Sequence, residues 1–215
     1  MKRRDFSARL AGLGLGASTL ATPLLAQAQA KALSESDYVR LSQPLSVEKG
    51  KVEVVEFFWY GCPHCFAFEP ALDAWQKKLP ADVAFRRVPV AFRESYTIHQ
   101  RLFYAIEAMG KVEELHRKVF QAIHGERKRF EKEDEILEFV GKNGVDTAKF
   151  KELLSSFTVS TKAKQASRLA EAYKIDGVPA LGIGGKYYTS GQQAGSPDRS
   201  LVVADALIDR VRKGG

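Results

Sequence analysis

Two cysteines separated by two residues constrain this chain more than any other feature. Cys62 and Cys65 are the only cysteines among 215 residues, and they stand in the tetrapeptide Cys62-Pro63-His64-Cys65. A disulfide framework that stabilises a small secreted domain needs several cysteines spread along the sequence. A bond between cysteines this close constrains so little chain that it adds almost no loop-closure entropy. The pair is therefore expected to serve chemistry rather than stability.

The flanking sequence predicts that the pair opens a helix. Residues 51–60 (KVEVVEFFWY) are β-branched and aromatic, which is typical of a buried strand, and a helical pattern begins near Cys62. Free backbone N–H groups and the helix dipole favour an anion at that position, so the pKa of the Cys62 thiol should be lowered. His64 can add a positive charge or a hydrogen bond to the same sulfur. Cys65, one turn later, should be more buried and should resolve a mixed disulfide.

Other roles for these residues stay open at this level. A structural disulfide would also account for two cysteines, and a zinc site would need about four ligands in tetrahedral geometry. The histidines outside the motif, His99, His116 and His124, come with no second cluster of ligands. We interpret these three as helix-surface residues and expect no metal site.

The order of the expected elements around the motif indicates an α/β fold. Residues 83–90 (VAFRRVPV) form a second expected strand, so strand, helix and strand follow one another. This order favours a right-handed crossover and a parallel pair of strands. Pro70 falls within the intervening helix, where it should cause a kink because it lacks a backbone N–H and clashes with the carbonyl four residues earlier.

The remainder of the chain is helical first and mixed afterwards. Residues 95–174 carry apolar positions at helical spacing and show no strand pattern. Two short strands, 180–183 and 186–189, then flank Gly184-Gly185, a pair suited to a two-residue hairpin turn. Pro197 opens a final helix. The predicted order is therefore βαβ, a helical block, and ββα.

The first thirty residues are typical of a cleavable export signal. A basic start at residues 2–4 precedes a mildly apolar stretch over residues 10–25. Two small-x-small cleavage patterns follow, Ala26-Gln27-Ala28 and Ala28-Gln29-Ala30. Arg3-Arg4-Asp5-Phe6 resembles a twin-arginine signal, while an ordinary Sec signal that carries two arginines remains the alternative. We expect an exported, soluble mature protein, since no later segment is long and apolar enough to span a bilayer.

The charge of the mature chain argues against a nucleic-acid binder. Residues 1–30 carry a net charge of +3, so cleavage would lower the formal charge from +7 to +4. The remaining charge is spread along the chain, whereas a nucleic-acid-binding protein concentrates lysine and arginine on one face. No nucleic-acid partner is expected.

A second motif, Ile175-Asp176-Gly177-Val178-Pro179, precedes the predicted hairpin. A proline that leads into a strand is a liability unless it stands at the strand start or at an edge. Taken alone, this segment could simply end a loop. Together with the cysteine motif, it favours a cis Val178-Pro179 bond, because a cis proline is usually a deliberate feature of a tight turn.

The two motifs together resemble the DsbA family of periplasmic disulfide-forming oxidoreductases. The resemblance is carried by residues 55–69 (VEFFWYGCPHCFAFE), 177–180 (GVPA) and 185–187 (GKY), and the helical block matches that family by pattern. It implies a thioredoxin fold with an inserted helical domain. The corresponding division is a signal at 1–30, a first thioredoxin-like part at 31–94, the insert at 95–174 and a second part at 175–215.

The resemblance also implies roles for individual residues. Cys62 would be the exposed nucleophile and Cys65 the resolving cysteine, with a redox-active disulfide between them and His64 stabilising the Cys62 thiolate. Pro179 would be the cis proline facing the disulfide, and Val178 would present its backbone to an extended substrate. Glu56 matches an acidic residue that could relay a proton for Cys65, although a salt-bridged strand carboxylate is the alternative. Glu69 is expected to be a solvated or paired helix residue, and Pro70 departs from the family's acidic pair.

The function implied is that of a protein disulfide oxidase in the periplasm. It would donate the Cys62–Cys65 disulfide to reduced, newly exported proteins and would need no cofactor within the chain. A quinone-linked membrane oxidase of the DsbB type would regenerate the disulfide. A reductase or an isomerase is the nearest alternative, but no dimerisation segment precedes Lys51, and a monomer is expected. A peptide-binding chaperone or a metallochaperone is the alternative from another class.

Overall fold

The apolar segment before the cysteine motif forms a strand inside a mixed sheet. In the computed structural model, which describes residues 33–47 and 50–215, this strand is β2, Val52–Phe58. The described part of the chain contains one five-stranded sheet with the order β1-β5-β4-β2-β3. The other strands are β1 (Val39–Arg40), β3 (Val83–Pro89), β4 (Ala180–Ile183) and β5 (Tyr187–Ser190). The predicted export signal lies outside the described residues.

The pairing of the strands confirms the predicted order of elements. β2 and β3 are parallel, with Val54 opposite Phe85 and Glu56 opposite Arg87. On its other edge β2 pairs with β4 in antiparallel fashion. β4 and β5 form a hairpin whose turn places Gly184 and Gly185 at φ +58° and +65°. Both angles lie in the left-handed region that glycine enters without steric cost, which explains the Gly-Gly pair.

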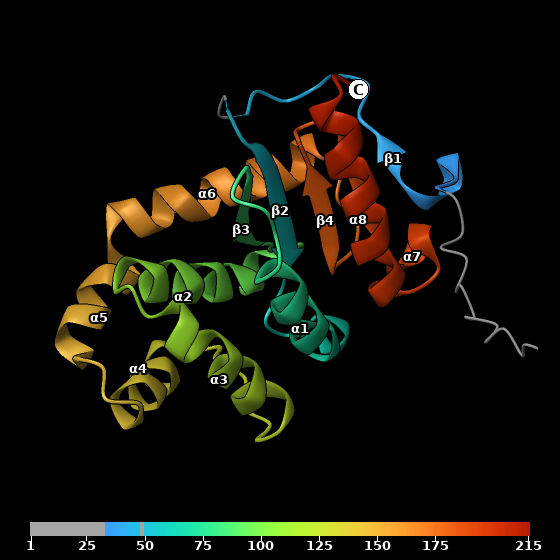
Figure 1. Cartoon of the computed structure of the whole chain (residues 1–215). Coiled ribbons are helices and arrows are strands. Elements are labelled where there is room, and N and C mark those ends of the chain that lie inside the picture. Colours follow the sequence, from blue (N-terminus) through green and yellow to red (C-terminus); the bar gives the residue numbers. More distant parts are fainter. Residues whose placement is uncertain (1–32, 48–49) are drawn as a thin grey trace, which may run out of the picture. The chain divides into compact units, whose positions relative to one another are not determined.

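Helices surround the sheet and fill the interval between β3 and β4 (Figure 1). α1, Pro63–Gln76, connects β2 to β3, and α8, Pro197–Arg212, ends the chain. The helical insert consists of α2 to α6, which lie between β3 and β4 in the sequence. Its helices are α2 (Thr97–Ala108), α3 (Val112–His124), α4 (Glu133–Lys142), α5 (Thr147–Ser155) and α6 (Phe157–Ala172). The fold is thus a thioredoxin fold with an inserted helical domain, as predicted.

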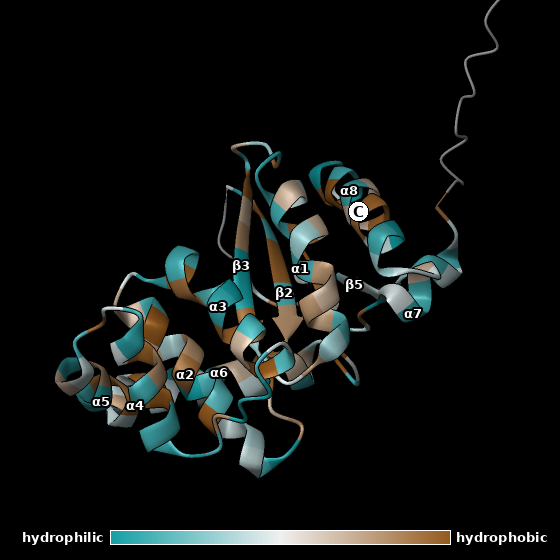
Figure 2. Cartoon of the chain, turned by 90° about the horizontal axis from the view of Figure 1, so that it is seen from below, coloured by the Kyte–Doolittle hydropathy of each residue, from teal (hydrophilic) through white to brown (hydrophobic). Residues whose placement is uncertain are grey.

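Alternate residues of β2 pack on opposite faces of the sheet. Val54 belongs to a buried cluster with residues of α1 and α8, such as Leu72 and Leu207. Phe57 points the other way and meets the ring of Tyr173, just after α6, at a centroid distance of 5.2 Å. Because side chains alternate along a strand, a strand covered on both faces has to be almost continuously apolar. Figure 2 shows this hydrophobic character along β2 and mixed colours on the outer helices.

Four short elements were not predicted, one of them the 3-10 turn Glu94–Tyr96 before α2. The sequence before β2 contains a 3-10 turn, Glu35–Asp37, and β1, which pairs with β5. The segment after β5 forms α7, Gly191–Ala194. Elements this short carry too few apolar positions for a periodic pattern, so tertiary contacts decide them. No helix among residues 33–47 and 50–215 combines the length and the apolar character needed to cross a membrane.

Candidate active site

Cys62 occupies the N-cap position of α1, as the sequence predicts. Its backbone is extended (φ −87°, ψ 115°), and Pro63 takes the first helical position, where a missing N–H costs nothing. The Cys62 N–H donates to the Trp59 carbonyl at 2.9 Å and closes the turn that leads out of β2. The backbone N–H of Cys65 donates to Cys62 Sγ at 3.3 Å. The sulfur therefore acts as the capping acceptor of the helix.

The two thiols differ in their access to solvent. Cys62 is 7% exposed and Cys65 is fully buried, and both are free thiols. The predicted order of exposure is confirmed, but Cys62 is less open than the expected exposed nucleophile. A reacting thiolate therefore has only limited access to the Cys62 sulfur.

The same helix shifts the pKa values of the two cysteines in opposite directions. A hydrogen bond from the Cys65 thiol, supported by the backbone N–H groups of Cys65 and His64 and by the charge of His64, lowers the pKa of Cys62 to about 6. Burial opposes this shift. The pKa of Cys65 is raised well above its usual value, first by burial and then by its interactions with Cys62 and the charge of Glu56. At neutral pH the thiolate of the reduced pair therefore resides on Cys62.

The Val178-Pro179 segment lies directly against the Cys62 sulfur. The peptide bond between these residues is cis, as predicted, and Cys62 Sγ lies 3.4 Å from the Val178 carbonyl oxygen, to which it donates in its protonated form. A cavity of about 270 Å³ adjoins this contact. Its walls include His64, Val178, Pro179, Tyr188 and Gln192. The structure thus brings together Cys62, His64, Val178 and Pro179 from segments more than a hundred residues apart.

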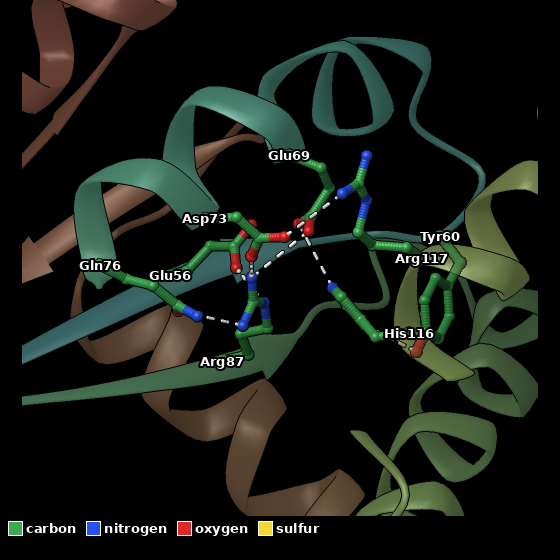
Figure 3. A network of polar contacts seen from close by, with 8 residues as sticks. All are labelled: Glu56, Tyr60, Glu69, Asp73, Gln76, Arg87, His116 and Arg117. Atoms are coloured by element: carbon green, nitrogen blue, oxygen red, sulfur yellow. Dashed lines mark hydrogen bonds and ion pairs between the residues drawn. The ribbon is translucent and has the colours of Figure 1, made fainter. Parts of the chain in front are cut away.

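Glu56, whose charge acts on Cys65, belongs to a buried cluster of charges (Figure 3). Arg87 stands at its centre, with Nε 3.0 Å from Glu56 Oε2 and NH2 3.3 Å from Glu69 Oε2 and 2.8 Å from Asp73 Oδ1. Gln76 accepts a further hydrogen bond from Arg87 at 3.2 Å. The strand register explains the first pair, since Glu56 and Arg87 are direct neighbours across β2 and β3.

The Glu56 carboxyl is paired by charge but poorly hydrogen-bonded. The Arg87 Nε contact has the distance of an ion pair without the angle of a hydrogen bond, and neither Glu56 oxygen has a hydrogen-bond partner among the described residues. Burial, followed by the negative charge of Glu69, raises the pKa of Glu56 well above its usual range, against the effect of Arg87. Glu56 therefore lies in an ion pair with Arg87, as the alternative expectation had it, and its burial shifts its pKa upward.

Glu69 is a central member of this cluster rather than a solvated helix residue. It is 2% exposed, and its Oε1 lies 3.3 Å from His116 Nε2, while Tyr60 Oη lies 2.9 Å from His116 Nδ1. Burial acts to raise the pKa of Glu69, but the His116 hydrogen bond and the charge of Arg87 lower it below its usual value. Of the two roles expected for Glu69, the paired one is confirmed.

The interpretation of the histidines as surface residues is wrong for His99 and His116. They are 6% and 3% exposed. The missed signal was helical spacing: His99 precedes Phe103 by four residues, as His116 precedes Phe120, so both histidines lie on apolar faces. Burial lowers the pKa of both side chains.

The buried cluster includes three side chains of the kind that bind metals. One ligand atom each from Glu56, Glu69 and His116 lies within 4.8 Å of the other two. The Arg87 guanidinium contacts both carboxylates and supplies the positive charge that a metal would bring. The cluster is thus already arranged around a cation of the chain itself.

Comparisons with known proteins agree with this geometry. Residues 53–198 match the model of the DSBA-like thioredoxin domain. The thiol:disulfide interchange protein DsbA of Azotobacter vinelandii is 44% identical over 206 residues, covering 92% of this chain and 96% of that protein. The Bordetella pertussis protein of the same name is 43% identical and covers 99% of this chain and 100% of its own. The crystal structure of Pseudomonas aeruginosa DsbA superposes with a TM-score of 0.80 at 43% identity, covering 83% of this chain and 93% of that one.

The matched family, the identities over nearly the whole chain and the shared fold agree with a low-pKa cysteine at a helix N-terminus beside a cis proline. The chain belongs to the DsbA-like thioredoxin family and is a thiol–disulfide oxidoreductase.

Proposed function

We propose that this oxidoreductase is a protein disulfide oxidase that donates the Cys62–Cys65 disulfide to reduced proteins. A substrate thiolate attacks Cys62 Sγ, the Cys62–Cys65 bond breaks, and Cys65 leaves with the electron pair and takes up a proton. A second substrate thiolate then attacks the substrate sulfur of the mixed disulfide, and Cys62 leaves as a thiolate. The substrate loses two electrons to form its disulfide, and the enzyme gains them as a dithiol.

The observation that carries the proposal is the lowered pKa of Cys62, about 6. Whatever stabilises this thiolate stabilises the reduced enzyme, and a stable reduced form makes the disulfide form a stronger oxidant. The low pKa also makes Cys62 a good leaving group in the second step, because a weaker base departs faster. Both effects favour donation of the disulfide over reduction of substrates.

Glu56 is proposed to supply the proton that Cys65 takes up. Cys65 has no access to solvent, so its proton must come from a neighbouring group. The charge of Glu56 contributes to the raised pKa of Cys65, and burial raises the pKa of Glu56, so this carboxyl releases its proton less readily than an exposed glutamate does. An acid–base group works best when its pKa lies near the working pH.

The cavity beside Val178 and Pro179 is proposed to hold an extended segment of the substrate. The Val178 carbonyl already faces Cys62 Sγ, so a peptide that pairs with this backbone would bring its own cysteine to the reactive sulfur. Reduced, newly exported proteins in the periplasm are the proposed substrates. A quinone-linked membrane oxidase of the DsbB type is the proposed regenerating partner, and the enzyme is proposed to act as a monomer after cleavage of residues 1–30.

The proposed division of the chain follows the same family pattern. The thioredoxin-like parts would span 31–94 and 175–215, and the insert 95–174. The cysteine motif and the cis-proline segment then come from different parts of the thioredoxin-like domain, which the insert separates in sequence. The reaction needs no nucleic acid, and its electrons pass only between sulfur atoms.

The test is the equilibrium of residues 31–215 with glutathione, together with catalytic oxidation of a reduced, unfolded protein. A potential near that of DsbA enzymes, about −120 mV, supports a disulfide donor, whereas a value near that of thioredoxin, about −270 mV, means a reductase. Cys62→Ser should abolish catalytic oxidation and leave simple peptide binding intact. Oxidation that survives in Cys62→Ser would contradict the mechanism.

A further inference from the structure

Every histidine outside the cysteine motif contacts at least one of the two residues that lead into the active-site turn, Trp59 and Tyr60. The chain has four histidines, one of which is His64. Trp59 Nε1 donates to His99 Nδ1 at 3.0 Å. Tyr60 Oη lies 2.9 Å from His116 Nδ1, and the Tyr60 carbonyl lies 2.9 Å from His124 Nε2. The three histidines come from α2 and α3, so the helical insert contacts both residues of the Trp59-Tyr60 segment.

The chemistry of the partners fixes the protonation of two of these histidines. An indole N–H can only donate and a backbone carbonyl can only accept. His99 Nδ1 must therefore be unprotonated, and His99 Nε2, which lies 2.9 Å from the Arg129 carbonyl, must carry the proton. His124 Nε2 likewise donates to the Tyr60 carbonyl. His99 can hold Trp59 only in its neutral form, whereas His124 can hold Tyr60 in either form.

The segment that the histidines hold determines where Cys62 lies. The Trp59 carbonyl accepts the Cys62 N–H at 2.9 Å, and Gly61 separates Tyr60 from Cys62. The Trp59 indole covers Gly61 so closely that a Cβ there would lie 2.3 Å from Cζ2 of the ring. The indole also stacks on Tyr96 at 4.0 Å. A shift of Trp59 or Tyr60 would therefore move the turn and the sulfur that caps α1.

Packing of the histidine rings adds to these hydrogen bonds between the insert and the active-site turn. The His124 ring stacks on Phe66 of α1 at a centroid distance of 5.0 Å and an angle of 9°. His116 is buried, and Figure 3 shows it between Tyr60 and Glu69. Both residues thus link α3 to the β2–α1 connection at points on either side of the cysteine motif.

We propose that His99, His116 and His124 are positioning residues of the redox site: the helical insert uses them to clamp Trp59 and Tyr60 and thereby holds Cys62 Sγ at the N-terminus of α1. The inference rests on the proposed function, because it assumes that Cys62 is the reactive thiolate. The insert then contributes to the oxidising strength of the enzyme although it supplies no reacting atom. His99 makes part of this clamp sensitive to pH.

The matched pair His124→Phe and His124→Gln tests the clamp. Phenylalanine keeps the ring stacked on Phe66 and loses the donor to the Tyr60 carbonyl, whereas the glutamine amide can still donate. For His124→Phe we expect the equilibrium with glutathione to shift about threefold to tenfold toward the disulfide form, since one hydrogen bond is lost. The pKa of Cys62 should rise by about half a unit to one unit in parallel. His124→Gln should stay close to the wild type in both measurements.

The outcomes separate the clamp from the proposed function. If wild-type Cys62 has an ordinary pKa and the enzyme is weakly oxidising, the proposed function fails. If the wild type is strongly oxidising and folded His124→Phe has the same glutathione equilibrium and the same Cys62 pKa, the clamp fails. Should His124→Phe not fold, Trp59→Phe provides the second test, because it removes the donor to His99 and keeps an aromatic ring.

The pH sensitivity is tested by the fluorescence of Trp59 in a Trp75→Phe background. The groups that face His99 are the Trp59 indole, the Tyr60 ring, the Arg129 carbonyl and the charge of Glu131. Burial lowers the pKa of His99 below 6.5, so a neutral His99 holds Trp59 at neutral pH and releases it on acidification. We expect an emission change with a midpoint below pH 6.5 that is absent in His99→Gln. A change that persists in His99→Gln, or no change in the parent, would overturn this part of the clamp.

Discussion

The two cysteines of the motif carry the same thiol group but lie in opposite surroundings. Toward the Val178-Pro179 segment, Cys62 caps a helix, receives a backbone N–H and contacts Val178, which lines a cavity, and its pKa is lowered to about 6. Toward the interior, Cys65 is fully buried beside the carboxyl of Glu56, and its pKa is raised. One turn of helix thus separates a stabilised thiolate from a thiol that resists ionisation. This asymmetry decides which sulfur leaves as an anion and which one needs a proton.

The largest effect is expected from the cation at the centre of the interior side. Arg87→Leu leaves three carboxyl groups without their shared partner, so it should destabilise the protein by about 3–5 kcal/mol. The neighbouring Arg86 is the matched control. Its ion pair with Glu53 at 2.8 Å involves an arginine side chain that is 46% exposed, and Arg86→Leu should cost about 0–1 kcal/mol. Urea unfolding measures the loss of unfolding free energy in both variants. Equal losses in Arg87→Leu and Arg86→Leu would mean that the cluster does not depend on Arg87.

The two buried glutamates should respond to pH with opposite signs. The pKa of Glu69 is lowered by folding, so its contribution to stability is present above the unfolded pKa of about 4.5 and is lost as the pH falls through the folded value. Glu69→Gln should therefore cost about 1.5–3 kcal/mol at neutral pH, with the difference from the wild type vanishing in acid.

The pKa of Glu56 is raised by folding, so ionised Glu56 destabilises the protein at high pH. Glu56→Gln should be at least as stable as the wild type at neutral pH, and its advantage should disappear below the unfolded pKa. Unfolding measured across the acid range compares the two variants. Parallel pH profiles for Glu56→Gln and Glu69→Gln would show that the two carboxyls do not hold their protons differently.

Smaller effects are expected at the thiolate itself, and they rank the causes of its low pKa. The hydrogen bond from Cys65 is the largest contribution and the charge of His64 is the smallest. Cys65→Ala should raise the pKa of Cys62 by about one unit or more, and His64→Leu by about half a unit or less. Ultraviolet absorbance of the thiolate during a pH titration measures both shifts. A larger shift in His64→Leu would reverse this order and make the histidine the main source of the thiolate's stability.

Local sequence patterns were sufficient to predict those elements whose structure depends on a few neighbouring residues. The β-branched run before Cys62, the helix that the cysteine opens and the Gly184-Gly185 hairpin follow from short stretches of sequence, and the structure confirms them. The cis bond before Pro179 was predicted only from the proline segment and the cysteine motif together, and the structure confirms it as well. Glu56 was identified through the resemblance to the DsbA family, although its partner was not.

Contacts between segments far apart in the sequence could not be predicted from those local patterns. The partners of Glu56 depend on the register of β2 against β3, which places Arg87 opposite it. The burial of His99 and His116 depends on how the insert packs against the Trp59-Tyr60 segment. β1 has only two residues, and its pairing with β5 supplies the backbone partners that its own sequence does not specify.

The sequence by itself therefore determined the chemistry: a cysteine at a helix N-terminus, a second cysteine one turn later, and a proline at the start of a strand. These features are local, because helix caps and turns act over a few residues. The tertiary structure decided the electrostatic surroundings: which charges stand behind Cys65 and which histidines hold the turn. Burial and distance set the strength of such interactions, and both exist only once segments far apart in the chain have packed together.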